Sequence, residues 1–223
     1  MKSLAAFVAG TALALSANAA TVSFSFNNPL ATTEINQFGV LGLFNGTLGT
    51  LTGVALNLSG SSTTQLTLTN NSVQSQIVQA TGTVNLFFGS SLGALSGILA
   101  TANPLLNLSA TTGFQTIGSG GSFTSGLLTA SQSTAFSVTT IQNSFSNPGG
   151  GPLDITCKSL SGLALTGGGG QIGSTQATQA NCGGSIVYTF TPTVNRVPEP
   201  TSLALMGLAL AGLGLMRRKV GKA

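Results

Sequence analysis

The chain has 223 residues, of which only 4% are charged, against about 25% in an ordinary soluble domain. Its formal charge of +4 comes from its two ends, because residues 20–195 carry only Glu34, Asp154 and Lys158. A nucleic-acid-binding surface needs lysine and arginine clustered on a folded face. One lysine cannot supply that cluster, so the composition excludes nucleic acid as a partner of residues 20–195.

Residues 1–19 have the three parts of a secretory signal peptide. Lys2 supplies the positive charge, an apolar stretch follows, and Ala17-Asn18-Ala19 is a cleavage site made of small residues. The apolar stretch is too short for a transmembrane helix. We therefore expect export through the Sec machinery and cleavage by signal peptidase after Ala19.

Residues 20–195 are expected to form one all-β ectodomain, because apolar and polar residues alternate in short rows. Each row is bounded by glycine, asparagine, serine or proline, as in antiparallel strands that place one face on a core. The pattern favours an antiparallel β-sandwich of the jelly-roll kind. The rows are residues 22–26, 54–58, 66–68, 82–88, 106–108, 136–138, 163–165 and 186–190.

The connections between these rows are predicted from their composition. Residues 59–62, Ser-Gly-Ser-Ser, are expected to turn the chain between two strands, and residues 147–152, Asn-Pro-Gly-Gly-Gly-Pro, to form a loop. Residues 74–80 and 92–100 have room for brief helices. No helical pattern is long enough to dominate the fold.

Cys157 and Cys182 are the two cysteines of the chain. In an exported segment an even pair indicates one disulfide. In the chain-entropy model, closing a loop of this length stabilises the fold by about 3.5 kcal/mol. A metal or redox pair is the weaker alternative, since the chain has no histidine and the spacing is not C-x-x-C.

The residues that catalysis or metal binding would need are scarce. Without histidine, neither a Ser/His/Asp nor a Cys/His arrangement can form. A glycoside hydrolase would require Glu34 and Asp154 to converge, because they are the two carboxylates of residues 20–195. A strong calcium site gathers several carboxylates. The sequence therefore predicts no catalytic residue, no metal site and no cofactor, and a protein that is not an enzyme.

Residues 196–223 combine a short motif, an apolar run and a basic cluster. The motif is extended, since each proline lacks an N–H and restricts the residue before it. As a helix, residues 201–216 would span about 24 Å, short of the ~30 Å hydrocarbon core, which makes a weak membrane anchor. The basic cluster is expected to stay in the cytoplasm. The motif is Val197, Pro198, Glu199 and Pro200, and the cluster is Arg217, Arg218 and Lys219.

The order of motif, apolar helix and basic cluster closely resembles the PEP-CTERM sorting signal of exported bacterial proteins. The resemblance runs from Val197 through Lys219 without a gap. It implies cleavage at or near the motif by an exosortase, an integral-membrane cysteine protease. It also implies a Gram-negative bacterium that makes extracellular polysaccharide. The physical pattern without the resemblance leaves an ordinary tail anchor equally open.

A second resemblance lies in residues 43–54, Leu-Phe-Asn-Gly-Thr-Leu-Gly-Thr-Leu-Thr-Gly-Val, followed by Leu56 and Leu58. This phrase is similar to the one that leads into a β-strand in the choice-of-anchor E family of exported domains. The aromatic strand at residues 187–190, ahead of the anchor, is similar as well. The resemblance implies placement at the cell surface through interchangeable anchors, with no defined activity.

These observations predict an exosortase-sorted structural protein that is membrane-anchored before processing and then lies at the cell surface or in the extracellular matrix. It would act by self-association between neutral surfaces. An extracellular glycan-binding module is the alternative, although the chain has no tryptophan and its one tyrosine, Tyr188, fits a core-facing row. Carbohydrate recognition would then rest on asparagine and glutamine. A glycoside hydrolase is the third reading.

Overall fold

The computed structural model describes residues 19–193, 207, 208 and 210. The chain divides into two units, Met1–Pro192 and Thr193–Ala223. In the second unit Gly207, Leu208 and Leu210 are helical, and within the described residues no helix is long and apolar enough to cross a bilayer. The predicted signal peptide (apart from Ala19), the sorting motif, the basic cluster and most of residues 201–216 lie outside the described residues.

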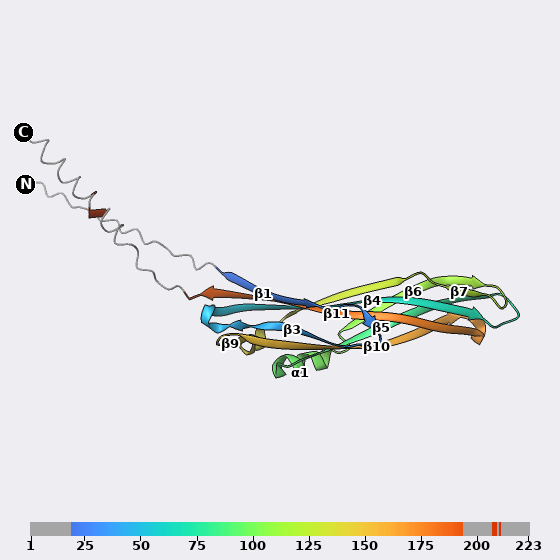
Figure 1. Cartoon of the computed structure of the whole chain (residues 1–223), viewed down its shortest axis with the longest axis horizontal. Coiled ribbons are helices and arrows are strands. Elements are labelled where there is room, and N and C mark those ends of the chain that lie inside the picture. The colour runs from blue at the N-terminus through green and yellow to red at the C-terminus, as the bar shows by residue number, and fades with distance from the viewer. Residues whose placement is uncertain (1–18, 194–206, 209, 211–223) are drawn as a thin grey trace, which may run out of the picture. The chain divides into compact units, whose positions relative to one another are not determined.

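The first unit is built from two β-sheets (Figure 1). Sheet I has the order β1 (Ala20–Asn27), β11 (Ile172–Pro192), β4 (Gly49–Asn70) and β7 (Ser122–Thr124), with β2 (Ala31–Thr32) paired to β11 and β8 (Leu128–Ser137) paired to β4. Sheet II has the order β6 (Leu106–Ile117), β5 (Gln76–Ser90), β10 (Gly151–Gly167), β3 (Asn36–Asn45) and β9 (Ser146–Asn147). Helix α1 (Gly93–Ala102) and the 3-10 turns η1 (Gly46–Leu48), η2 (Thr139–Phe145) and η3 (Gly168–Gly170) connect strands.

The pairing is antiparallel except between β3 and β9, which are parallel. Without the short strands, the sheets are β1-β11-β4-β8 and β3-β10-β5-β6. Along the chain every connection between successive long strands crosses from one sheet to the other, except β5–β6, which stays within sheet II. This arrangement is that of a double-sheet jelly roll. The prediction of an all-β, antiparallel, two-sheet body is confirmed.

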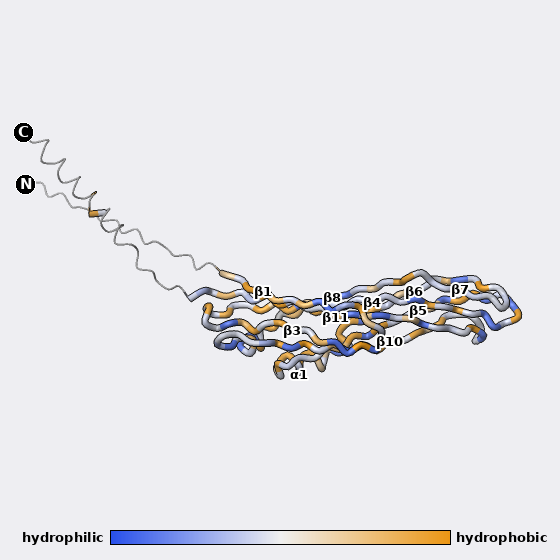
Figure 2. Tube along the Cα trace, in the orientation of Figure 1, coloured by the Kyte–Doolittle hydropathy of each residue, from blue (hydrophilic) through white to orange (hydrophobic). Residues whose placement is uncertain are grey.

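The predicted rows of alternating residues fall on strands β1, β4, β5, β6, β8, β10 and β11, and their apolar residues mostly face the core. Figure 2 shows hydrophobic and hydrophilic residues following one another along these strands. The main core cluster contains side chains from both sheets, among them Leu56 and Leu58 of β4, Leu86 of β5 and Ile155 of β10. A smaller cluster is formed by Leu66, Leu68, Val78, Ala80 and Ile117. Burial of these apolar side chains is the main stabilising contribution to the fold.

The predicted turn at residues 59–62 is wrong, because β4 runs through them without a break. Gly60 faces inward, where a Cβ atom would overlap the side chain of Leu86 and approach the Asn181 carbonyl oxygen. Glycine is therefore needed here for close packing of the two sheets, which is one of its roles inside a strand. The flanking Ser59 and Ser61 have half-buried side chains on the outward face.

Three further expectations about connections had different outcomes. Residues 76–80, in the segment where a brief helix was expected, belong to strand β5, and Val78 and Ala80 are fully buried there. The helix expected at residues 92–100 is α1. The loop expected at residues 147–152 is a turn in which Gly149 and Gly150 have φ values of 83° and 78°. Those values lie in the left-handed region that favours glycine.

The two sheets also approach one another at their edges. On one side, Phe24 and Phe26 of β1 place their rings where a Cβ atom would stand at Gly42 and Gly39 of β3. On the other side, the backbone N–H of Asn107 in β6 donates to the side-chain oxygen of Gln132 in β8 at 3.0 Å. Both outward faces of the sandwich remain open to solvent, and the candidate sites lie on them.

Candidate functional site

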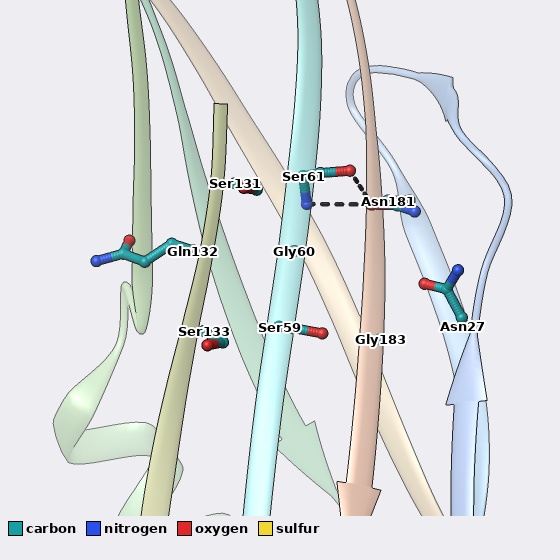
Figure 3. A pocket seen from close by; sticks show the side chains of 9 residues that line it. All are labelled: Asn27, Ser59, Gly60, Ser61, Ser131, Gln132, Ser133, Asn181 and Gly183. Carbon is teal, nitrogen blue, oxygen red and sulfur yellow. Dashed lines mark hydrogen bonds between the residues drawn. The ribbon is translucent and has the colours of Figure 1, made fainter. Parts of the chain in front are cut away.

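The outward face of sheet I has a hollow of ≈420 Å³ lined entirely by small or uncharged polar residues (Figure 3). An adjoining hollow of ≈390 Å³ shares Asn27 and Ser59 with the first. The first is lined by Asn27, Ser59, Gly60, Ser61, Ser131, Gln132, Ser133, Asn181 and Gly183.

The register of four strands places these residues together. Asn27 of β1 pairs with Gly183 of β11, which pairs with Ser59 of β4, which pairs with Ser133 of β8. Residues that pair in this way lie on the same face of a sheet. A Cβ atom at Gly183 would lie 2.9 Å from Ser59 Oγ and 3.1 Å from Asn27 Oδ1, so the glycine leaves room at the centre of the row.

Some of the polar groups that line this hollow are already hydrogen-bonded. Asn181 Oδ1 accepts hydrogen bonds from Ser61 N at 3.0 Å and from Ser61 Oγ at 2.6 Å (Figure 3). Asn181 Nδ2 donates to the Asn28 carbonyl oxygen at 2.9 Å. None of the nine described lining residues titrates near neutral pH. The hollow can form hydrogen bonds, but its lining cannot supply a general acid or base.

Glu34 lies between β2 and β3 and is exposed. Its carboxylate accepts hydrogen bonds from Ser161 N at 2.8 Å, from Ser161 Oγ at 2.7 Å and from Ser159 Oγ at 3.1 Å. Ser159 Oγ in turn accepts from Ile35 N at 2.9 Å. The carboxylate therefore links the segment just before β3 to β10 by hydrogen bonds.

Asp154 lies on the outward face of sheet II, opposite Val40 of β3. It precedes Ser159 and Ser161, the partners of Glu34, by five and seven residues on the same strand. At about 3.3 Å per residue, the carboxyl groups of Glu34 and Asp154 are about 15 Å apart or more. A glycosidase pair requires less than about 10 Å. The convergence that the glycoside hydrolase reading required is therefore not present.

Cys157 of β10 and Cys182 of β11 form a disulfide, as predicted. Both are buried in the main core cluster. The bond therefore acts as a link between the two sheets. Within the described residues, no group of three or more histidine, cysteine, aspartate or glutamate side chains lies together to hold a metal ion.

Tyr188 is fully buried, as its place in a core-facing row predicted. Its hydroxyl donates to the Gly42 carbonyl oxygen at 2.8 Å, which links β11 of sheet I to β3 of sheet II. Burial raises the pKa of the Tyr188 phenol well above its usual value of about 10. The ring is packed against Phe24, Phe44 and Phe145, so it offers no face to a sugar.

Two exposed aromatic residues were not predicted from the sequence. Phe38 is 64% exposed on β3 and Phe114 is 63% exposed on β6. A phenylalanine in an alternating row normally indicates a core position. Both of these lie in strands that the alternation did not fully mark out, so no signal in the sequence assigned them to the outward face.

These findings define a class: an all-β, two-sheet domain with an inter-sheet disulfide and two open, weakly charged faces. One comparison with a family model concerns the other end of the chain. Residues 196–219 match the family model of the PEP-CTERM protein-sorting motif. The match confirms the predicted sorting signal and indicates an exported protein that is sorted by an exosortase. It does not extend to residues 20–195, whose resemblance to choice-of-anchor E domains stays a prediction.

No curated protein matches the chain. Among solved structures, a chain of Mud crab tombus-like virus aligns at 8% identity over 92% of this chain and 98% of that chain, with a TM-score of 0.19. A chain of the T13 particle of IBDV aligns at 8% identity over 92% of this chain and 50% of that chain, with a TM-score of 0.18. These scores are too low to support any argument about fold or function.

Proposed function

We propose that this protein is a structural component of the cell surface or extracellular matrix of a polysaccharide-producing Gram-negative bacterium. The precursor is exported, held in the membrane by residues 201–216, and released from that anchor or transferred by an exosortase at Val197–Pro200. The resemblance of residues 43–58 to choice-of-anchor E domains supports the same placement. The body would then act by packing against copies of itself.

The observation that carries the structural role is the absence of charge on sheet I. Its six strands contain no aspartate, glutamate, lysine or arginine. The outward rows consist mainly of serine, threonine, asparagine, glutamine and small residues, such as Asn57, Ser59 and Thr63 on β4, with Val187 of β11 as an exposed apolar exception. Natural sheets commonly carry charged residues that oppose association. Sheet I carries none, so electrostatic repulsion between two such faces is absent.

The contacts between two such faces would be hydrogen bonds and van der Waals packing. Hydrogen bonds between neutral groups are screened by salt much less than ion pairs are. We therefore expect the exported body to self-associate, with an association constant that changes little between about 20 mM and about 500 mM salt. Analytical ultracentrifugation at both concentrations measures this. A body that stays monomeric at high protein concentration would contradict the structural role.

A charge placed on sheet I tests the face directly. Ser133→Lys adds a cation on the outward row of β8 and should weaken association at low salt, with recovery at high salt. Ser109→Lys is the matched control, since Ser109 is exposed on β6 of sheet II. Equal effects of the two substitutions would mean that sheet I is not the association face.

A further inference from the structure

Sheet II has a hollow of its own on its outward face, of ≈430 Å³, where β3, β10 and β5 lie beside the start of α1. The register builds its floor: Thr156 of β10 pairs with Phe38 of β3 on one side and with Gly89 of β5 on the other. Asp154 lies two residues before Thr156 and on the same face. The volume falls within the ~300–1,000 Å³ range of small-ligand sites.

Gly89 keeps this hollow open. A Cβ atom at residue 89 would stand 2.7 Å from Thr156 Oγ1 and would fill the floor between β5 and β10. On the opposite side of Thr156, the Phe38 ring rises from β3 and is 64% exposed. The hollow therefore has an aromatic wall, a polar floor and a carboxylate at one end.

Hydrogen bonds with backbone groups fix the positions of Ser90, Ser91 and Asp154. The two serine O–H groups and the Asp154 carboxylate remain available to bind a ligand. Ser91 and Asp154 form two hydrogen bonds with each other: Ser91 N donates to the Asp154 carbonyl oxygen at 3.0 Å, and Asp154 N donates to Ser91 Oγ at 3.0 Å. Ser90 Oγ accepts from Leu92 N at 3.1 Å. The two serine hydroxyls accept in these contacts, so their O–H groups remain able to donate. Within residues 19–193, no hydrogen bond or ion pair engages the Asp154 carboxylate.

The chemistry of the lining selects the ligand. One carboxylate is too few for a strong calcium site. The same carboxylate repels anions, and the exposed ring adds an apolar surface that a small ion would not use. A pyranose unit matches every part: its C–H face packs on the aromatic ring, and its hydroxyl groups donate to the carboxylate and accept from the serines.

We propose that this hollow binds a hexose unit of an uncharged extracellular polysaccharide, with Phe38 as the stacking wall and Asp154 as the principal hydrogen-bond acceptor. The site lies on sheet II, whereas the proposed self-association face is sheet I. Binding of polysaccharide and packing of copies are therefore separable functions. The failure of one in an experiment leaves the other intact.

The test is an NMR titration of the isotope-labelled exported protein with three oligosaccharide probes. Two are neutral glucan hexasaccharides, one β-1,4-linked and one α-1,6-linked, and the third is an anionic alginate hexasaccharide. We expect at least one neutral probe to shift the amide signals of Ser91 and Thr156, and the alginate to bind more weakly. Shifts confined to the Ser61 and Asn181 region of sheet I, or no shifts with either neutral probe, would overturn the proposal.

Substitutions identify the contacts. Phe38→Ala should weaken binding of the neutral probe about tenfold, because it removes the stacking wall. Phe114→Ala is the matched control, since Phe114 is 63% exposed on the same sheet but outside the hollow. Asp154→Asn keeps the shape and should weaken the neutral probe while improving alginate. Equal losses for Phe38→Ala and Phe114→Ala, or an unchanged preference in Asp154→Asn, would refute the assignment of these residues.

Discussion

Cys157 of β10 and Cys182 of β11 are joined by a disulfide that connects sheet II to sheet I, with their Cα atoms 6.4 Å apart. The two residues are 25 positions apart in the sequence and are 1% and 0% exposed. The segment between them contains the glycine turn η3, which has many conformations to lose on folding. The covalent link limits that loss in the unfolded chain.

Removing this link should destabilise the body by about 3.5 kcal/mol. The double substitution Cys157→Ala/Cys182→Ala is preferable to reduction, because it leaves no thiols to react. Urea unfolding, followed by the fluorescence of the single tyrosine, gives the free energy of unfolding. A change below about 1 kcal/mol would show that the link contributes little to the stability of the sandwich.

The alternation of residue types was sufficient to predict an all-β, antiparallel body, because burial leaves a period-two record in the sequence. The disulfide was predicted separately, from an even pair of cysteines in an exported segment. The alternation failed where two distant segments meet. Gly60 was interpreted as part of a turn, since nothing near it in the sequence shows that Leu86 lies against it. Strand β3 was not among the predicted rows. Its outward face carries Phe38 and Val40 in place of polar residues, so apolar and polar residues do not alternate along it.

The candidate sites could not be predicted from the sequence for the same reason. The hollow on sheet I depends on a row formed by Asn27, Ser59, Ser133 and Gly183, which come from four strands. The hollow on sheet II depends on a second such row, formed by Phe38, Thr156 and Gly89 from three strands. In contrast, the sorting signal is continuous in the sequence, so the motif, the apolar run and the basic cluster were all recognisable in order.

Tyr188 should make the stability of the body fall at alkaline pH. Burial raises the pKa of the folded phenol, so the phenol of the unfolded chain, with a pKa of about 10, loses its proton first. Unfolding is therefore favoured above pH ~10, by up to about 1.4 kcal/mol per pH unit, until the folded phenol also ionises. Below pH ~10 this contribution to stability is complete.

Two measurements check this behaviour. Tyrosinate absorbance reports Tyr188 alone, because it is the single tyrosine and the chain has no tryptophan. At pH ~11 the folded protein should show much less tyrosinate than the urea-unfolded protein, in which about nine tenths of the phenol is ionised. In Tyr188→Phe the extra loss of stability above pH ~10 should disappear, whereas loss of the bond to the Gly42 carbonyl should cost about 1 kcal/mol at neutral pH. Equal tyrosinate absorbance in the folded and unfolded proteins at pH ~11 would show that burial does not raise the pKa of Tyr188.

Asn70 should be the most costly polar substitution at the end of β4. It is fully buried, and its Nδ2 group donates to the carbonyl oxygens of Gln74, Ile117 and Gly118 at 2.8, 2.9 and 3.1 Å. Asn70→Ala leaves these carbonyls without that donor and should cost about 2–3 kcal/mol. The control is Asn57→Ala on the exposed face of the same strand, which should change stability by less than about 0.5 kcal/mol. Similar values for the two would show that the Asn70 contacts are not stabilising.

The sorting motif is tested by substitutions that leave the membrane segment unchanged. Glu199→Ala or Pro198→Ala should give a precursor that keeps residues 201–223 and stays in the membrane fraction. Thr193→Ala is the control outside the motif and should be processed normally. Immunoblotting of membrane and extracellular fractions distinguishes the two forms. Normal release of the Glu199→Ala protein would show that the peptide is an ordinary linker.

Intact-mass spectrometry of the native product tests whether this protein is exported and sorted. We expect a polypeptide that begins at Ala20, ends at or near Val197–Pro200, and is lighter by two hydrogens because Cys157 and Cys182 are joined. A cytosolic product that retains Met1 and Ala223, with both thiols reduced, would contradict this expectation.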